Sequence, residues 1–543
     1  MKKHYPFVII FLLILFYAVN NFIWLRLNDF PPFAGQAYHL SKGLEYSQAF
    51  KNPPGKHPLV MMLEIDKLRP PLFHLCLGIG NIICGNPITV CALINILFAA
   101  LLFLSVYYIG RLLQSKTTGL MAVFILSMYP YVFGLSRMAK TNLASMALIS
   151  TAIYCLLCTD NFKRRLPSVF LGISFGLAAL VRLQFIFFVI GPVIAAIIIA
   201  FSDKELISAR KRLIFNLTLS IGIAILVAGF WYLPKLFFLL KTYSYYGFSS
   251  NFPPEFSPKL FSPPSLTFYF RGLVDGQITP FFFLFFLIGF LELFKRKKLN
   301  PILLSWIIVS FIILTLVKSK EFRMTSEYLP AFALITAGGI LLLQKRWLKR
   351  CLVFIIILGG LLQYLLVSFT NPSSTRIRLS FFNGKSAKGR IASSYLYPLS
   401  EAYLHYPGRG DWQINKVMSA IQKEGAANNK NMIIGCTDAY LDVKTDWFDP
   451  FNLGTWHDNF VAANSDALNY FVRANGLSYN VVSLSYWQED WRNIPMLDFI
   501  VSVKEIENIA PALSRQYKLI LQAEAPDKSP IYVYKKIPPS IKI

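Results

Sequence analysis

Residues 6–25 read PFVIIFLLILFYAVNNFIWL, and this stretch decides the class of fold. It contains no charged residue and is about as long as a helix that crosses the hydrocarbon core of a bilayer. It follows Met1-Lys2-Lys3-His4, is too long for the core of a signal peptide, and is not followed by a small-residue cleavage site. We therefore interpret it as a retained first transmembrane helix.

The remaining chain has the same apolar character. Of its 543 residues, 55% are hydrophobic and 15% are charged. Hydropathy and short basic loops predict a polytopic α-helical membrane protein with about eleven transmembrane helices. The predicted spans are 6–25, 88–110, 117–135, 143–158, 168–182, 184–201, 213–233, 279–294, 301–317, 328–343 and 351–369. The apolar stretch Leu72–Cys84 is too short to span comfortably, so we interpret it as a re-entrant or interfacial helix.

The strong positive charge of the chain indicates its orientation. Lysine and arginine number 54 against 28 acidic residues, which gives a formal net charge of +26. Much of the excess lies in short clusters between apolar runs, at 163–165, 210–212, 295–298 and 345–350. Short basic loops mark the cytoplasmic side and contact anionic lipid headgroups. No nucleic-acid recognition motif accompanies the charge, so we expect membrane lipids as partners and no nucleic acid.

This orientation places several segments outside the cell. With the amino terminus inside, the stretches 26–71, 136–142 and 234–277 face the exterior, as does everything after about residue 370. We expect a multi-pass protein of the inner (plasma) membrane whose C-terminal part is extracytoplasmic.

The tail divides the chain into two predicted domains, 1–370 and 371–543. After about residue 370 the sequence has ordinary polarity and alternates between strand-like and helix-like runs. Strands are predicted at 431–435, 480–484, 497–503 and 531–534, and helices at 412–424, 462–475 and 504–516. Such alternation predicts a small extracytoplasmic α/β domain. It contains no GxGxxG sequence, so we infer no nucleotide site there.

Four short motifs lie in stretches predicted to face outside. The first is Pro31-Pro32-Phe33-Ala34-Gly35-Gln36-Ala37-Tyr38-His39, and the second is Arg69-Pro70-Pro71-Leu72. The third is Ser136-Arg137 followed by Asn142-Leu143, and the fourth runs from Lys320 to Pro330 with Arg323 and Tyr328. Their order and spacing over residues 1–370 resemble the GT-C glycosyltransferases, in particular the protein O-mannosyltransferases and the bacterial aminoarabinose transferase.

The resemblance implies a reaction. Members of this superfamily transfer a sugar from a polyprenyl-phosphate donor to an acceptor hydroxyl, with inversion at the anomeric carbon. The acceptor needs a base, and the departing phosphate needs positive charge. In this superfamily an acid in the first loop acts as the base or helps to hold a divalent metal, such as Mg or Mn. The implied partners are therefore the polyprenyl-phosphate sugar and a lipid, glycan or protein acceptor.

The chain departs from the family pattern at both expected acids. Gly35 stands at the position of the first acid, and Asn142 stands at the position of the second. Three explanations stay open: another carboxylate substitutes, the chain is an inactive relative, or the alignment register is different. Substitute carboxylates are Asp29 first, then Glu45, Glu64 and Asp66.

These considerations give a set of candidate site residues. The catalytic candidates are Asp29, His39, whose imidazole could act as a base, and Asn142, which could accept one hydrogen bond. The candidates for binding the donor are Arg69, Arg137, Arg182, Lys320, Arg323 and Tyr328. Arginine suits phosphate because its guanidinium can bind two oxygens at once. The alternative is that these basic side chains extend to lipid headgroups.

Three functions remain compatible with the sequence. The first is a membrane glycosyltransferase. The second is a catalytically inactive relative that binds a lipid-linked glycan or scaffolds a partner enzyme. The third is a lipid or glycan transporter, which internal repeats and midplane charges would favour. The sequence shows neither feature, because its ionisable residues cluster in the predicted loops.

Overall fold

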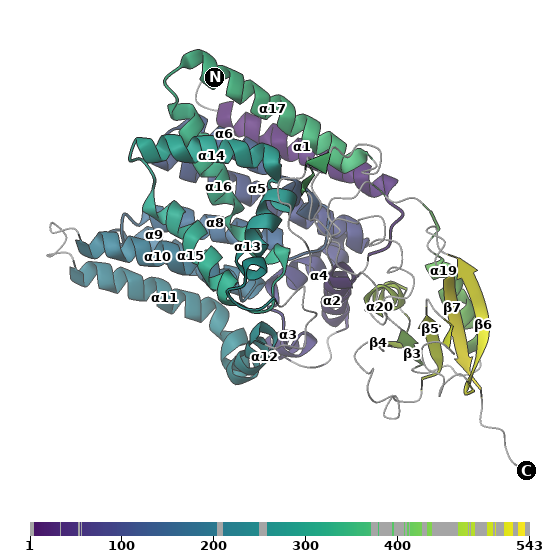
Figure 1. Cartoon of the computed structure of the whole chain (residues 1–543). Coiled ribbons are helices and arrows are strands. Elements are labelled where there is room, and N and C mark those ends of the chain that lie inside the picture. Colours follow the sequence, from purple (N-terminus) through teal and green to yellow (C-terminus); the bar gives the residue numbers. More distant parts are fainter. Residues whose placement is uncertain are drawn as a thin grey trace, which may run out of the picture.

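The computed structural model describes residues 5–370 apart from 33, 53–54, 56, 203–209 and 249–257. Beyond residue 370 it describes 378–379, 394–395, 407, 410–411, 413–425, 432–436, 465–475, 477, 479–483, 497–502, 505–506, 515–524 and 530–537. Figure 1 shows a large body of packed helices and, beside it, a smaller part built around a sheet. The two parts correspond to the two kinds of sequence on either side of residue 370.

Each of the eleven predicted spans is helical. The helices are α1 (Tyr5–Leu27), α5 (Pro87–Leu113), α6 (Lys116–Ser127), α8 (Asn142–Cys158), α9 (Arg165–Val181), α10 (Phe185–Ser202), α11 (Arg210–Tyr232), α14 (Thr279–Lys295), α15 (Pro301–Leu316), α16 (Leu329–Leu342) and α17 (Arg346–Phe369). The stretch 117–135 differs, because it is divided into α6 and a short helix α7 (Pro130–Leu135). Pro130 has no backbone N–H to continue α6, and it stands at the start of α7, where that group is not needed.

The helical body is that of a membrane protein. In the described part of the chain, six helices are long and apolar enough to cross a membrane, or seven if the bent pair that ends in α14 counts as one span. Helices α6, α8, α9 and α15 are apolar but shorter. Large apolar side chains point outward, among them Phe11, Leu97 and Leu226, with exposed fractions of 62%, 70% and 80%. Lipid tails can cover such a surface. The count of eleven spans stays a prediction.

Two stretches that hydropathy treats as loops contain helices. Residues 26–71 include α2 (Ala34–Lys51) and α3 (Pro58–Ile65). Residues 234–277 include η2 (Leu233–Lys235), α12 (Leu236–Phe248), α13 (Pro263–Arg271) and the π-helix η3 (Gly272–Gln277). Hydropathy misses α2 because it is not apolar. It is stabilised instead by close packing on α4 (Leu72–Cys84), where a Cβ on Gly78 would lie 2.6 Å from Cβ of Tyr46.

The C-terminal part contains a five-stranded sheet. Its strands are β3 (Ile433–Cys436), β4 (Asn480–Ser483), β5 (Phe499–Ser502), β6 (Tyr517–Glu524) and β7 (Pro530–Lys536), in the order β4-β3-β5-β7-β6. The pairs of β3 with β4 and β5 are parallel, and those of β7 with β5 and β6 are antiparallel. Helices α19 (Ile414–Gly425) and α20 (Ser465–Ala474) contribute to the apolar cluster on the sheet. A separate antiparallel pair joins β1 (Arg378–Leu379) to β2 (Ser394–Tyr395).

The predicted α/β character of the tail is confirmed, but the short strands β1 and β2 and one strand of the five-stranded sheet were not predicted. The sequence did not predict β6, because its side chains are largely exposed or half-buried and it lies at the sheet edge. Most of the helix predicted over 504–516 lies outside the described residues, and its described end, residues 515–516, is a turn that leads into β6.

The first loop joins the two parts of the molecule. Helix α20 lies beside α2 (Figure 1), and Arg473 of α20 forms an ion pair of 3.1 Å with Glu45 of α2. Phe30 packs against the apolar cluster of the C-terminal sheet. Next to it, an oxygen of the exposed Asp29 accepts a hydrogen bond of 3.5 Å from the backbone N–H of Gly410. This end of the loop therefore contacts the C-terminal part.

Helices α14 and α16 approach each other through glycine. A Cβ on Gly339 would lie 1.9 Å from the carbonyl oxygen of Gly289, and a Cβ on Gly289 would lie 2.8 Å from that of Thr336. Small residues let helix backbones pack closely within membranes, where the hydrophobic effect does not drive helices together. This crossing supports α16, which leads out of the segment that carries Arg323.

We expect Gly339→Ala to destabilise the protein, because the added methyl group forces α14 and α16 apart. Overpacking of this kind typically costs about 1–3 kcal/mol. The temperature at which detergent-solubilised protein loses its monodisperse chromatographic peak measures the effect. Gly222→Ala in α11 is the matched control, since a Cβ there meets nothing within 4 Å. Equal thermal stability of the two variants would contradict the close crossing.

Candidate functional site

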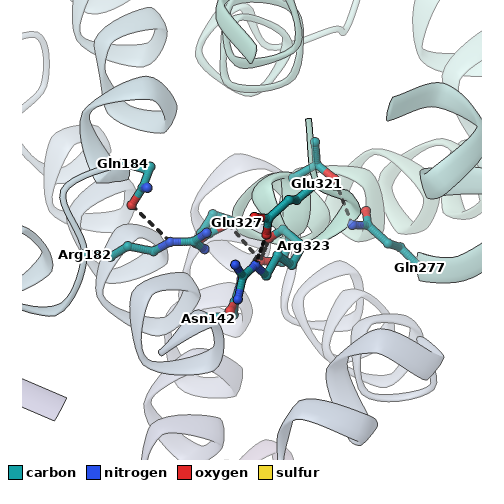
Figure 2. Close-up of polar contacts among 9 residues, drawn as sticks. Asn142, Arg182, Gln184, Gln277, Glu321, Arg323 and Glu327 are labelled. Carbon is teal, nitrogen blue, oxygen red and sulfur yellow. Dashed lines mark hydrogen bonds and ion pairs between the residues drawn. The ribbon is translucent and has the colours of Figure 1, made fainter. Parts of the chain in front are cut away.

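A buried polar network connects α8, α9 and the 3-10 helix η4 (Phe322–Tyr328), as Figure 2 shows. Asn142, the first residue of α8, donates hydrogen bonds of 2.8 Å to the carbonyl oxygen of Arg323 and 3.0 Å to the hydroxyl of Ser326. Ser326 donates in turn to the carboxylate of Glu327 at 2.7 Å. Asn142 therefore acts as a donor that fixes the backbone of η4.

The network ends in a buried ion pair. Glu327, which is fully buried, binds Arg182 across 2.5 Å, and the side chain of Arg182 is only 11% exposed. Arg182 follows the last residue of α9, and its Nε also donates to the side-chain oxygen of Gln184 at 3.2 Å. Breaking one side of a buried pair leaves an uncompensated charge, so this contact anchors η4 to α9.

A second carboxylate, Glu321, lies beside the same helix. It accepts a hydrogen bond from Nε of Arg323 (Figure 2). Burial raises the pKa of Glu321, but the nearby charges of Arg323, Arg182 and Lys140 outweigh burial and lower that pKa below its usual value. Glu321 is therefore ionised at neutral pH, and three cations act on it.

Lys140 lies against Gly35, the glycine at the position of the family's first acid. A Cβ on Gly35 would lie 2.8 Å from Nζ of Lys140 and 3.9 Å from Nη1 of Arg323. Lys140 is 8% exposed and precedes α8 by two residues. The space that a larger residue would need at position 35 is thus occupied by an ammonium group.

Arg69 is oriented by two histidines. Its Nη1 lies 3.3 Å from Nε2 of His39, and Nδ1 of His39 lies 2.7 Å from Nε2 of His74. A guanidinium can only donate, so His39 accepts at Nε2 and donates its Nδ1 proton to His74. Burial, with the charges of Arg69 and other nearby cations, lowers the pKa of His39 well below its usual value. His39 is therefore a neutral positioning group, and its basic nitrogen already binds Arg69.

Asp66 and Tyr38 complete this arrangement. Asp66 accepts hydrogen bonds from the Tyr38 hydroxyl at 2.6 Å and from the backbone N–H groups of Leu68 and Arg69 at 2.9 and 3.0 Å. The guanidinium carbon of Arg69 stacks over the Tyr38 ring, 3.9 Å from its centre. Asp66 thus shapes the turn that carries Arg69.

The remaining predicted residues have other surroundings. Arg137 is buried, with its guanidinium carbon 4.8 Å from the centre of the Trp24 ring. The ammonium of Lys320 donates to the carbonyl oxygens of Thr315 and Val317 at 2.7 and 2.9 Å, so it caps α15. Tyr328 is fully buried, and its ring packs near Phe188 and Phe332. Glu64 is exposed on α3.

The structure therefore brings together only part of the predicted set. Asn142, Arg182 and Arg323 belong to one network. The charges of Lys140 and Arg323 both lower the pKa of His39, which in turn binds Arg69. Sequence reasoning missed Lys140, Glu321 and Glu327. All three nevertheless lie inside the third and fourth motifs, between residues predicted to belong to the site.

By sequence, this chain is similar to one protein family and to one bacterial protein. Residues 68–232 match the family model of dolichyl-phosphate-mannose-protein mannosyltransferases. An uncharacterized protein of Aquifex aeolicus (strain VF5) is 25% identical over 342 residues. That match covers 62% of this chain and 64% of the relative, so it spans less than two thirds of the relative's length.

Solved structures are similar over nearly the whole chain. ArnT from Cupriavidus metallidurans, crystallised in the apo state, has a TM-score of 0.55 at 13% identity and matches 96% of this chain and 97% of its own. The Archaeoglobus fulgidus oligosaccharyltransferase AglB, bound to an inhibitory peptide and dolichol phosphate, has a TM-score of 0.53 at 12% identity. That match covers 98% of this chain and 74% of AglB.

The chain has the fold of the GT-C glycosyltransferase superfamily. The resemblance drawn from the four motifs is confirmed at this level, since the family match at residues 68–232 contains the second and third motifs and the structural matches cover nearly the whole chain. In this chain, Lys140 and Arg323 flank Gly35, the position at which the superfamily pattern has its first acid.

The donor set around Gly35 does not suit the divalent metal that the superfamily implies. Mg and Mn prefer carboxylate and other oxygen ligands, whereas the groups facing Gly35 are an ammonium and a guanidinium. Asn142 uses its amide N–H groups to hold η4. Over the described ranges, no three His, Cys, Asp or Glu side chains are grouped so that they could hold a metal ion.

We expect the stability of the protein to fall as the pH is lowered below about 6.5, the ordinary pKa of histidine, partly because of His39. Folded His39 stays neutral because its pKa is lowered, whereas unfolded His39 takes up a proton. The unfolded state then binds more protons than the folded state. The free energy of unfolding therefore falls by up to about 1.4 kcal/mol for each unit by which the pH is lowered.

Thermal unfolding of the detergent-solubilised protein between pH 7.5 and 5.5 measures this slope. His39→Gln should reduce it, whereas His57→Gln, which replaces an exposed histidine, should keep the wild-type slope. Stability that rises as the pH falls, or an undiminished slope in His39→Gln, would show that His39 is not held neutral.

Proposed function

We propose that this chain is a membrane glycosyltransferase that transfers a sugar from a polyprenyl phosphate to an acceptor hydroxyl outside the inner (plasma) membrane. One observation supports this most strongly: Arg323 binds the carboxylate of Glu321, and the positive charges of Arg182 and Lys140 also act on that carboxylate. Cations suit the phosphate of a donor, and a carboxylate can accept the proton of an acceptor.

The charge balance of the site favours an anionic ligand. Arg182 is paired with Glu327, and Arg323 is paired with Glu321. Lys140 and Arg69 are two further cations, Asp66 beside Arg69 is a third carboxylate, and His39 is neutral. A phosphate group bound here would therefore meet an excess of cations, which is the arrangement that electrostatic stabilisation of a leaving phosphate requires.

The relatives indicate the class of donor. One structure of ArnT, with a TM-score of 0.55 at 11% identity, holds undecaprenyl phosphate, and one of AglB holds dolichol phosphate. Another AglB structure is tethered to an acceptor peptide. We extend to this chain only the general pattern, a polyprenyl-phosphate sugar as donor and a lipid, glycan or protein as acceptor. The C-terminal domain, from about residue 371, would lie outside the membrane and recruit the acceptor.

We assign the role of general base to Glu321. Its carboxylate takes the proton of the acceptor hydroxyl while the hydroxyl oxygen attacks the anomeric carbon. The bond between that carbon and the phosphate oxygen breaks, and its electron pair leaves with the polyprenyl phosphate. A carboxylate with a lowered pKa is a weak base, so proton transfer accompanies the attack and does not precede it. Asp29, at the contact with Gly410, is the competing candidate.

A second candidate function is a non-catalytic protein that binds a lipid-linked glycan. The observation that favours it is the neutral pair Gly35 and Asn142, where the superfamily has acids. This protein would bind the donor with the same cations and would not transfer the sugar. No feature of the site favours the third function, a lipid or glycan transporter.

We expect Glu321→Gln to bind undecaprenyl phosphate as the wild type does but to lose sugar transfer by about a hundredfold or more, the usual contribution of a general base. The assay follows release of radiolabelled sugar from polyprenyl-phosphate donors in membranes. Glu292→Gln is the matched control, since it removes another carboxylate paired with a nearby arginine, Arg296.

The outcomes separate the candidates. Donor binding without any transfer by the wild type would favour the non-catalytic protein. Full transfer by Glu321→Gln together with loss of transfer by Asp29→Asn would reassign the base to Asp29.

A further inference from the structure

The position of Lys140 is unusual for a flexible surface residue. Its ammonium lies 2.8 Å from where a Cβ on Gly35 would stand, and its side chain is 8% exposed. It reaches this place from the segment between α7 and α8, two residues before Asn142. Glycine at position 35 is what leaves room for it, because any larger residue would have to displace the ammonium.

Two residues differ from the superfamily pattern, and Lys140 adds to their electrostatic effect. Gly35 and Asn142 are uncharged, whereas the superfamily pattern has acids at these two positions. Lys140 adds a positive charge at the place where the side chain of the first acid would lie. Two acids can hold a divalent cation, whereas a cation beside Lys140 and Arg323 would be repelled. The positive charge that a metal ion would supply at this place is therefore supplied by the side chains of Lys140 and Arg323.

The other cations of the site are held in place by neighbouring groups. Arg323, the other group facing Gly35, has its carbonyl oxygen bound by Asn142 and its guanidinium bound by Glu321. Arg182 is held by Glu327, and Arg69 is held by His39 and stacked on Tyr38. These cations come from four separate segments of the chain. Fixed cations stabilise developing negative charge because they need no rearrangement during the reaction.

We infer that Lys140, seated against Gly35, takes the place of a divalent metal, so that this chain binds the phosphate of its lipid donor without a metal ion. This inference rests on the proposed function. An ammonium is a compact point charge with three donors and is well suited to phosphate. As the bond from the anomeric carbon to the phosphate oxygen breaks, Lys140 neutralises the charge left on that oxygen and keeps its own proton.

The test measures binding of undecaprenyl phosphate to the full chain in nanodiscs by native mass spectrometry, with excess EDTA or with added Mg or Mn. Wild-type affinity should be the same in all three conditions. Lys140→Met should weaken binding by about tenfold or more, the size expected for loss of a hydrogen bond to a charged group. Lys116→Met, which removes an exposed lysine at the start of α6, should bind as the wild type does.

A second pair of variants tests the same idea if Lys140→Met does not fold. Gly35→Asp places a carboxylate against the ammonium and should weaken binding of the phosphate without creating a need for metal. Gly35→Ala adds the same Cβ without the charge and should weaken binding less than Gly35→Asp does, because it displaces the tip of a flexible side chain but does not neutralise its charge.

Each contrary outcome has a separate meaning. Loss of wild-type binding in EDTA, restored by Mg or Mn, would overturn the inference and leave the proposed function in place. If Lys140→Met or Gly35→Asp binds undecaprenyl phosphate with the affinity of the wild type, the inference is overturned as well. Absence of undecaprenyl phosphate binding under every condition would overturn the proposed function itself.

Discussion

The hydrogen bonds from Asn142 to the backbone and side chain of η4 are the contacts on which the site depends. They fix the carbonyl oxygen of Arg323 and, through Ser326 and Glu327, connect α8 to Arg182 at the end of α9. Because η4 is largely buried and is not an α-helix, its polar backbone groups need partners in the surrounding protein. Asn142 provides such partners for η4. The asparagine that stands at the position of the second acid therefore has a structural role.

The same segment determines the electrostatics of the site. Because η4 is fixed, the guanidinium of Arg323 faces Gly35 on one side and binds Glu321 on the other. Lys140 then fills the space beside Gly35, and Arg69 is directed by neutral His39. The two departures from the superfamily pattern are thereby connected, since glycine admits the ammonium and asparagine holds the segment that carries the second cation. A site of this kind can bind a phosphate through side chains alone.

Much of the fold follows from the sequence, because transmembrane segments are long apolar runs that hydropathy detects. Every predicted span is helical, whereas α2 was predicted as loop because its stability comes from packing on α4 and not from apolar composition. The candidate site was predicted less completely. Arg69, Asn142, Arg182 and Arg323 lie in it, but Lys320 caps α15 and Tyr328 is buried among aromatic rings. The contact between Lys140 and Gly35 joins residues about a hundred positions apart, and such a long-range contact cannot be predicted from local sequence patterns.

The central claim is that side-chain cations at Gly35 receive the phosphate of a polyprenyl donor. A cryo-electron microscopy structure of the full chain with undecaprenyl phosphate, prepared in EDTA, tests it most directly. The account predicts the phosphate within about 4 Å of Nζ of Lys140, the distance at which oppositely charged groups pair. A phosphate bound away from Lys140 and Arg323, or lipid density that appears at the site only when Mg or Mn is added, would contradict it.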